Sequence, residues 1–190
     1  MENKKRCQWC QSSEKMMEYH DNYWGSPVHD DQELYAKLVL DLNQAGLSWK
    51  TILNKTENFY EAYDQFDIKK VANYTEEDRE RLIQNSGIIR NKLKINAAII
   101  NAQKVLEIQK EFGTFDAYLW KFVDGKSVQH HIKDETKVPA SDDLSDKISK
   151  DMKKRGFKFT GTTVIYAYLQ AVGIINDHVE SCFRYQELSS

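Results

Sequence analysis

Apolar residues recur at helical spacing along most of the chain. In the segment 31–42 they fall three or four positions apart, on one face of a helix: Leu34, Tyr35, Leu38, Val39 and Leu42. The same spacing predicts further helices over 75–83, 91–113, 115–123, 142–155 and 162–173. Only two prolines occur, and no series of alternating segments resembles a sheet. The pattern therefore predicts an all-α fold.

Polar residues at the predicted helix ends support these boundaries. Thr75 stands three residues before Asp78, which is close to a capping box. Gly113 closes the long helix over 91–113, and Thr114 is placed to cap the next one. The polar stretch 124–143 is the best candidate for a long surface loop. It does not separate two cores, so we expect one domain over 1–190, with two lobes at most and a hairpin region at 82–100.

Composition excludes some classes of protein but does not identify the function. The chain has 190 residues, of which 41% are hydrophobic and 29% charged, as in an ordinary globular protein. Its net charge of −2 gives no general attraction to nucleic acid, so such a partner needs a local basic patch. No apolar run approaches a membrane span, and the start MENKKRCQWC lacks the apolar stretch of a signal peptide. We therefore expect a cytoplasmic protein that does not bind a membrane.

All three cysteines lie near the ends of the chain, with histidines close by. Cys7 and Cys10 form CQWC, His20 follows, and HVESC places His178 and Cys182 four positions apart. One helical turn would present the last two side chains on the same face. A structural zinc site takes four nitrogen or sulfur ligands, so two from each end would tie the ends together.

The residues alone do not decide which four side chains would bind the zinc ion. One choice combines Cys7 and Cys10 with His178 and Cys182, because two cysteines three apart commonly bind zinc. The other choice uses His20 in place of Cys10. A redox CxxC would be expected in a βαβ setting, which the pattern lacks, and plain packing of these side chains is the remaining interpretation.

Two loops combine glycine with residues suited to binding. In NQAGLSW (43–49), Ser48 is placed to cap the next helix, and the favoured interpretation is a tight turn whose Leu47 and Trp49 enter the core. The alternative is an exposed apolar tip at Leu47, with Gly46 allowing close backbone approach. In NSGIIRNKLKI (85–95), backbone N–H groups at a helix N-terminus, with Arg90, Lys92 and Lys94 alongside, suit a phosphate.

Taken in order, several stretches resemble the DNA-3-methyladenine glycosylase I family. These are RCQW, YHDNYWGSP, NQAGLSWKTIL, SGIIRNKLK, KKRGFKFTGTT and NDHVESC, which together span residues 7–182. The resemblance implies an all-α fold of the helix-hairpin-helix glycosylase superfamily. It also implies one structural zinc ion held by Cys7, His20, His178 and Cys182, which leaves Cys10 outside the site.

The resemblance further implies a pocket for a flipped base. Such an enzyme turns its target out of the stack, and aromatic faces attract the cationic ring of 3-methyladenine. The family's pocket residues fall on Trp9, Tyr19, Trp24 and Trp49. Where the family has a glutamate that reaches the base, this chain has Asp41, which keeps the charge with a reach shorter by one methylene. We predict that Asp41, Tyr19 and Trp49 take part in catalysis, while Trp9 and Trp24 bind the base.

The implied activity is monofunctional excision of 3-methyladenine from alkylated double-stranded DNA, with the free base as product and the protein as a monomer. Gly46 and Leu47 would fill the space left by the flipped nucleotide. Phosphates would be held by the hairpin residues Gly87, Ile88, Ile89 and Arg90. No lysine stands in the hairpin where a bifunctional enzyme would place its nucleophile, although Lys92 and Lys94 are near, and we assign no general base. The alternatives are a zinc-stabilised module that binds DNA or modified bases without catalysis, and a helical scaffold whose aromatic residues are core.

Overall fold

The computed structural model of the chain describes residues 4–189, so residues 1–3 and 190 of the predicted domain lie outside it. It is mostly helical, as predicted. The α-helices are α1 (Glu14–Asn22), α2 (Asp31–Gln44), α3 (Trp49–Asn54), α4 (Thr56–Ala62), α5 (Ile68–Ala72), α6 (Glu76–Gln84), α7 (Lys92–Phe112), α8 (Phe115–Trp120), α9 (Asp143–Lys154), α10 (Thr162–Ala171) and α11 (Phe183–Leu188). The short 3-10 helices are η1 (Gln8–Ser12), η2 (Asp64–Phe66), η3 (Lys121–Val123) and η4 (Glu135–Lys137).

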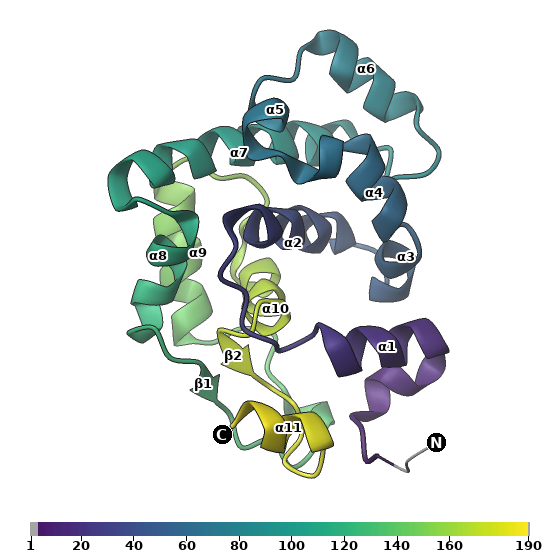
Figure 1. Cartoon of the computed structure of the whole chain (residues 1–190), viewed down its shortest axis with the longest axis vertical. Coiled ribbons are helices and arrows are strands. Elements are labelled where there is room, and N and C mark those ends of the chain that lie inside the picture. The colour runs from purple at the N-terminus through teal and green to yellow at the C-terminus, as the bar shows by residue number, and fades with distance from the viewer. Residues whose placement is uncertain (1–3, 190) are drawn as a thin grey trace.

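Helices α2 and α10 lie in the middle of the molecule (Figure 1). Helices α4 to α7 cover one end, α8 and α9 lie along one side, and α1 and α11 occupy the other end. The two terminal segments meet at that end, where the backbone N–H of Phe183 donates to the carbonyl of Lys5 at 2.9 Å. The fold therefore brings residues close to the N-terminus beside residues close to the C-terminus.

One hydrophobic core runs from α2 to the segment after α10. Buried tyrosines within it satisfy their hydroxyls on backbone carbonyls: Tyr35 donates to Ala98 at 2.8 Å and Tyr168 donates to Leu34 at 2.7 Å. These bonds hold α2 against α7 and α10, because a buried hydroxyl without a partner is costly. The single domain over 1–190 stays a prediction.

The predicted caps are present. Thr75 and Asp78 form a reciprocal capping box at the start of α6, and the Thr114 hydroxyl accepts from Ala117 N at 2.9 Å at the start of α8. Ser48 likewise caps α3 through Thr51 N at 3.2 Å. The helices predicted from periodicity are confirmed because their caps and apolar faces are encoded within a few residues.

The stretch 124–143 corrects the prediction of a plain loop. It contains η4 and a two-residue strand, β1 (Val128–Gln129), which pairs in parallel with β2 (Ile175–Asn176). This pair also makes the fold mostly helical and not entirely so. A pairing between segments nearly fifty residues apart has no local signature in sequence. The shorter helices α1, α4, α5 and α11 are further elements that the periodicity did not predict.

Within residues 4–189, no helix combines the length and the apolar character needed to cross a membrane.

Candidate functional site

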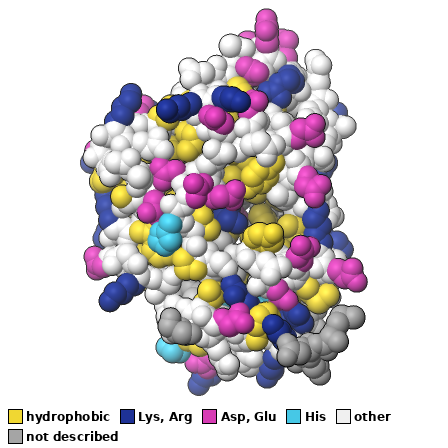
Figure 2. Space-filling view, viewed as in Figure 1, with side chains coloured by type: hydrophobic (Ala, Val, Ile, Leu, Met, Phe, Trp, Pro, Cys, Tyr) yellow, Lys and Arg dark blue, Asp and Glu magenta, His cyan; other side chains and the backbone are white. Residues whose placement is uncertain are grey.

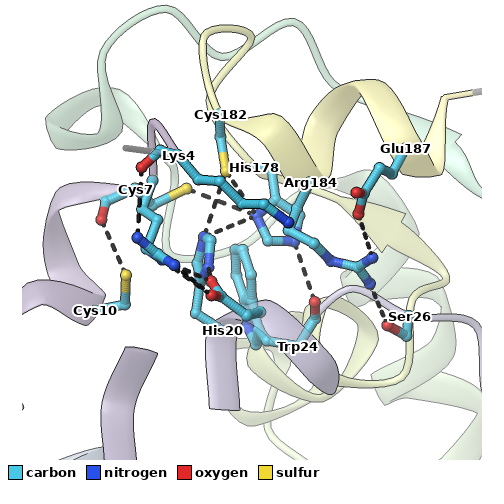
Figure 3. A network of polar contacts seen from close by, with 12 residues as sticks. Lys4, Cys7, Cys10, His20, Trp24, Ser26, His178, Cys182, Arg184 and Glu187 are labelled. Atoms are coloured by element: carbon cyan, nitrogen blue, oxygen red, sulfur yellow. Dashed lines mark hydrogen bonds and ion pairs between the residues drawn. The ribbon is translucent and has the colours of Figure 1, made fainter. Parts of the chain in front are cut away.

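Four buried side chains from the two ends of the chain converge in one cluster (Figure 3). The ligand atoms of Cys7, His20, His178 and Cys182 all lie within 4.8 Å of one another. His178 Nδ1 is 3.2 Å from His20 Nε2 and 3.7 Å from the sulfur of each cysteine. The hydrogen bond from the Cys7 thiol lowers the pKa of Cys182 well below its usual range, which favours a thiolate in the cluster. Two cysteines and two histidines are a donor set that zinc prefers.

The second nitrogen of each histidine has its own partner outside the cluster. His20 Nδ1 lies 2.8 Å from Asp21 Oδ1, and Arg6 Nη2 donates to the same carboxylate at 2.8 Å. His178 Nε2 donates to the carbonyl of Trp24 at 3.1 Å. Such outer contacts orient the ring nitrogens of metal-binding histidines and fix which atom faces the ion.

Gly25 belongs to this arrangement for a steric reason. A Cβ at this position would stand 2.8 Å from His178 Nε2, and the residue has φ +78°. The glycine in YHDNYWG therefore lets the backbone pass against the histidine ring.

Two expectations about the cluster have clear outcomes. Cys10 lies outside it, as the family resemblance implied, and its thiol donates to the carbonyl of Cys7 at 3.1 Å. The expectation of a helical turn over HVESC was wrong. His178 follows β2 in an irregular turn, closed by Cys182 N donating to Val179 O at 2.7 Å, and helix α11 begins only afterwards.

Beside the cluster lies a cavity of about 290 Å³ with aromatic walls. The four predicted aromatic residues all line it: Trp9, Tyr19, Trp24 and Trp49. Trp9 and Trp24 meet edge to face with ring centroids 5.1 Å apart, and Tyr19 and Trp49 are also 5.1 Å apart. Segment η1, helix α1 with the turn after it, and helix α3 thus supply these walls, while His20 on α1 points into the Cys/His cluster.

Asp41 lines the same cavity from the last turn of α2. Its side chain is buried, and among the described residues Oδ2 has no hydrogen-bond partner. Burial raises the pKa of Asp41 to about 7, against an opposing effect of Lys37 one helical turn earlier. Within the described residues, no hydrogen bond joins the Tyr19 hydroxyl to this carboxylate. Burial, with the Asp41 charge, instead raises the pKa of Tyr19, which keeps its hydroxyl protonated.

Trp49 supplies a buried hydrogen-bond donor to the same cavity. Its indole Nε1 is buried and, like Asp41 Oδ2, has no partner within the described part of the chain. A buried donor and a buried acceptor in one cavity are unfavourable unless a ligand or water pairs with them.

Sequence reasoning missed two other carboxylates in the cavity wall, Glu135 and Asp177. Glu135 of η4 accepts from the backbone N–H groups of Gln8 and Trp9. Asp177 is buried. Its Oδ1 lies 2.6 Å from His130 Nδ1, and its Oδ2 accepts a hydrogen bond from the Tyr166 hydroxyl. No lysine, arginine or histidine lines this cavity within the described residues. The wall is therefore acidic.

A second, larger cavity of about 710 Å³ shares Tyr19, Asp41 and Trp49 with the first. It lies between α1, α2 and α3, and Lys37 is among its lining residues. Figure 2 shows hydrophobic side chains around a hollow between these helices. Asp41 therefore stands where two cavities meet.

The loop 43–49 exposes its apolar tip. Leu47 is 41% exposed, and Gly46 has φ +79° with open space around it. The favoured prediction, that Leu47 enters the core, was wrong, because the left-handed glycine turns the chain outward before Ser48 caps α3. Trp49 is half-buried and faces the aromatic cavity.

The segment 85–91 forms a tight connection between α6 and α7. A Cβ on Gly87 would lie 3.0 Å from Asn85 Oδ1 and 3.2 Å from Asn58, so a larger residue here would crowd these two side chains. The N–H of Gly87 donates to Asn85 Oδ1 at 2.8 Å and that of Ile88 to Asn85 O at 3.4 Å. The backbone N–H groups of Ile89 and Arg90 have no protein partner in the described residues.

Side chains near this connection differ in exposure. Ile88 is buried in the core, whereas Arg90 is exposed. Lys92 is exposed too, but Lys94, which we had grouped with the cations facing a phosphate, is buried at 6% exposure. Lys94 is therefore not a surface cation.

Comparison with known proteins agrees with this geometry. A profile of the methyladenine glycosylase family matches residues 9–185. DNA-3-methyladenine glycosylase 1 of Escherichia coli K12 is 43% identical over 180 residues, which cover 95% of this chain and 96% of that protein. DNA-3-methyladenine glycosylase of Haemophilus influenzae is 41% identical over 177 residues, which cover 93% and 96%.

Solved structures give the same result for the fold. A crystal structure of 3-methyladenine DNA glycosylase I has a TM-score of 0.91 at 44% identity, covering 94% of this chain and 98% of its own. The Staphylococcus aureus enzyme, solved to explain 3-methyladenine recognition, has a TM-score of 0.90 at 34% identity, covering 94% and 95%. The likeness extends over nearly the whole chain in sequence and in structure. This chain therefore belongs to the methyladenine glycosylase family.

Proposed function

We propose that this protein is a DNA repair enzyme that excises 3-methyladenine from alkylated double-stranded DNA. The observation that carries the proposal is the acidic aromatic cavity, in which Asp41 Oδ2 and Trp49 Nε1 are buried without hydrogen-bond partners among residues 4–189. 3-Methyladenine in DNA carries a delocalised positive charge and N–H donors, so it complements both the rings and the carboxylate. Relatives that are DNA-3-methyladenine glycosylases support the choice of base.

The chemistry asked of the protein is modest. The bond between the base nitrogen and C1′ of the sugar breaks, and its electron pair stays with the base, which leaves as neutral 3-methyladenine. Water adds to C1′ and loses a proton to solvent, leaving an abasic site. Because the cationic base is a good leaving group, tight binding of the flipped base next to Asp41 supplies most of the catalysis. Tyr19 and Trp49 hold the base, with Trp9 and Trp24 completing the wall.

We assign no general base, and the other carboxylates support this. Asp177 is engaged by His130, Tyr166 and Gln170, and Glu135 holds backbone N–H groups. No lysine of the described residues lines the aromatic cavity. We therefore expect hydrolysis without a lyase step, since a lyase needs an amine that reaches C1′.

DNA contacts follow from the two exposed loops. The connection between α6 and α7 acts as the hairpin of a helix-hairpin-helix element, in which free N–H groups of Ile89 and Arg90 receive a phosphate near Gly87 and Ile88. Gly46 and Leu47 enter the space that the flipped nucleotide leaves, because an apolar tip replaces lost base stacking.

The cluster of Cys7, His20, His178 and Cys182 fits one zinc ion. Its four donors fill a tetrahedral set, so the ion would be structural and would join the terminal segments. Its contribution would be to hold α1, and with it Tyr19 and Trp24, in place. We expect the enzyme to act as a monomer, and we place it in the cytoplasm with the DNA of its bacterial relatives.

The test is release of free base from methylated duplex DNA, scored separately for 3-methyladenine and 7-methylguanine. We expect release of 3-methyladenine. Binding to methylated DNA without any release would instead identify a zinc-stabilised binding module, and the proposed enzyme function would be wrong.

A further inference from the structure

Lys94 is a buried cation without an acidic partner. It is 6% exposed, and none of the ion pairs of the described residues includes it. Burial lowers its pKa, as expected for an ammonium group removed from water. A buried charge of this kind is costly, so the contacts that compensate it indicate what the side chain holds in place.

Those contacts are two backbone carbonyls at the end of α2. Lys94 Nζ donates to Asn43 O and to Ala45 O, both at 2.7 Å. These are among the last carbonyls of the helix, which have no partner within it and form the negative end of its dipole. The ammonium therefore satisfies two acceptors and a helix dipole together.

The two ends of this contact belong to different parts of the proposed DNA-binding surface. Asn43 and Ala45 lie between Asp41 and Leu47 in the sequence. Asp41 is the proposed base-recognition carboxylate, and Leu47 with Gly46 forms the apolar tip that we propose enters the base stack, called the wedge below. Lys94 lies in the first turn of α7, directly after the connection that presents Arg90. Its own N–H is held by the cap residue Asn91 at 3.1 Å.

A second set of contacts holds the connection to the next helices. Lys55 Nζ donates to Ser86 O and Asn58 Nδ2 donates to Gly87 O, both at 3.1 Å. Lys55 and Asn58 follow α3, the helix that the wedge loop enters. Neither Lys55 nor Asn58 bonds to residues 43–47, whereas Lys94 does so through its ammonium group.

We propose that Lys94 is a positioning residue, which fixes the loop of Gly46 and Leu47 and the end of α2 at the distance from the hairpin that phosphate binding requires. The proposal rests on the proposed function. We call the contact of Lys94 with Asn43 O and Ala45 O the tether. When the hairpin binds the DNA backbone, the tether holds Leu47 at the base stack and Asp41 at the cavity. The tether matters most when a base must be drawn from an intact duplex, because the wedge then has to replace stacking.

The experiment compares Lys94→Met with Lys110→Met, which removes the same charge from an exposed position in the last turn of the same helix, away from the hairpin. Single-turnover excision of 3-methyladenine is measured on duplex DNA and on DNA that carries the same base in a single-nucleotide bulge. We expect Lys94→Met to slow excision about tenfold or more on the duplex, since two hydrogen bonds to a charged group are lost. On the bulge the loss should be at least several-fold smaller, and Lys110→Met should follow the parent on both substrates.

A double variant distinguishes a loss of positioning from a general loss of folding, because misfolding would slow excision equally with or without Leu47. If Lys94 acts through the wedge, Lys94→Met should slow duplex excision much less in a Leu47→Ala background than in the parent. Equal losses on duplex and bulge, additive effects with Leu47→Ala, or no loss at all would each overturn the proposal. If Lys94→Met does not fold, Lys94→Gln, which keeps one neutral amide donor, takes its place. Absence of excision by the parent protein would refute the proposed function and not the tether.

Discussion

Replacing Asp41 with asparagine removes one charge from a buried site and keeps the shape of the side chain. In the part of the chain that the structure describes, the parent carboxylate has no hydrogen-bond partner at Oδ2, and Lys37 offsets the effect of burial only in part. The protein thus carries a group that is unfavourable in the empty enzyme and complementary to a cationic base. Asp41→Asn should make the protein more stable and less active, as expected where stability is given up for function.

The stability change follows from the pKa. The pKa of Asp41 is raised from 3.8 to about 7 in the folded protein. The folded state therefore binds the proton more tightly, and the free energy of unfolding falls as the pH rises from about 4 to about 7. At about 1.4 kcal/mol per pKa unit, the full loss above pH 7 amounts to about 4 kcal/mol. The asparagine variant lacks this loss, so its stability relative to the parent should increase by about 3 kcal/mol from pH 5 to pH 8.

The activity change has the opposite sign. Losing a charged hydrogen bond to the base should cost about 1–3 kcal/mol of transition-state stabilisation, which slows single-turnover excision about fivefold to 150-fold. The parent should also lose activity as the pH falls below about 7, because protonated Asp41 no longer attracts the cation. This fall in excision rate at low pH is the acid limb of the pH profile, and Asp41→Asn should lack it. Asp41→Glu should keep or raise the activity.

Urea unfolding of both proteins at pH 5 and pH 8 measures the first effect, and effects of pH on the metal cluster cancel in the comparison. Single-turnover excision between pH 5.5 and 8.5 measures the second. The proposed role of Asp41 is refuted if Asp41→Asn excises 3-methyladenine as fast as the parent and the difference in unfolding free energy between the two proteins is the same at pH 5 and pH 8. Asp41 would then be only a polar residue at a helix end. Recognition would then rest on the aromatic walls alone.

Three further predictions concern the metal, the DNA and the charge near Asp41. Cys182→Ala should release zinc and lower the melting temperature, whereas Cys10→Ala should do neither; equal metal loss from both, measured by metal analysis, would show a wrong ligand set. Arg90→Glu should weaken binding to damaged and undamaged DNA alike in a titration, and an effect on damaged DNA only would make Arg90 a lesion reader. Lys37→Met should move the acid limb of excision to higher pH, because Lys37 lowers the pKa of Asp41; an unchanged pH profile would show that Lys37 has no such effect.

Local sequence signals were sufficient for the longer helices. Caps such as Thr75 with Asp78, and the glycine that ends α7, act within three or four residues, so the chain encodes them without tertiary contacts. The motif order identified the family, and with it the four aromatic residues and the Cys/His set that the structure brings together.

Other features were decided only by the tertiary structure. Lys94 and Arg90 look alike in sequence, yet one is buried against the end of α2 and the other is exposed. Glu135 and Asp177 enter the cavity wall because β1 pairs with β2 across a long separation. Sequence spacing reports only neighbours along a helix or strand, whereas these positions depend on which distant surfaces pack together. Packing of that kind is a property of the whole core, and so no short stretch of residues determines it.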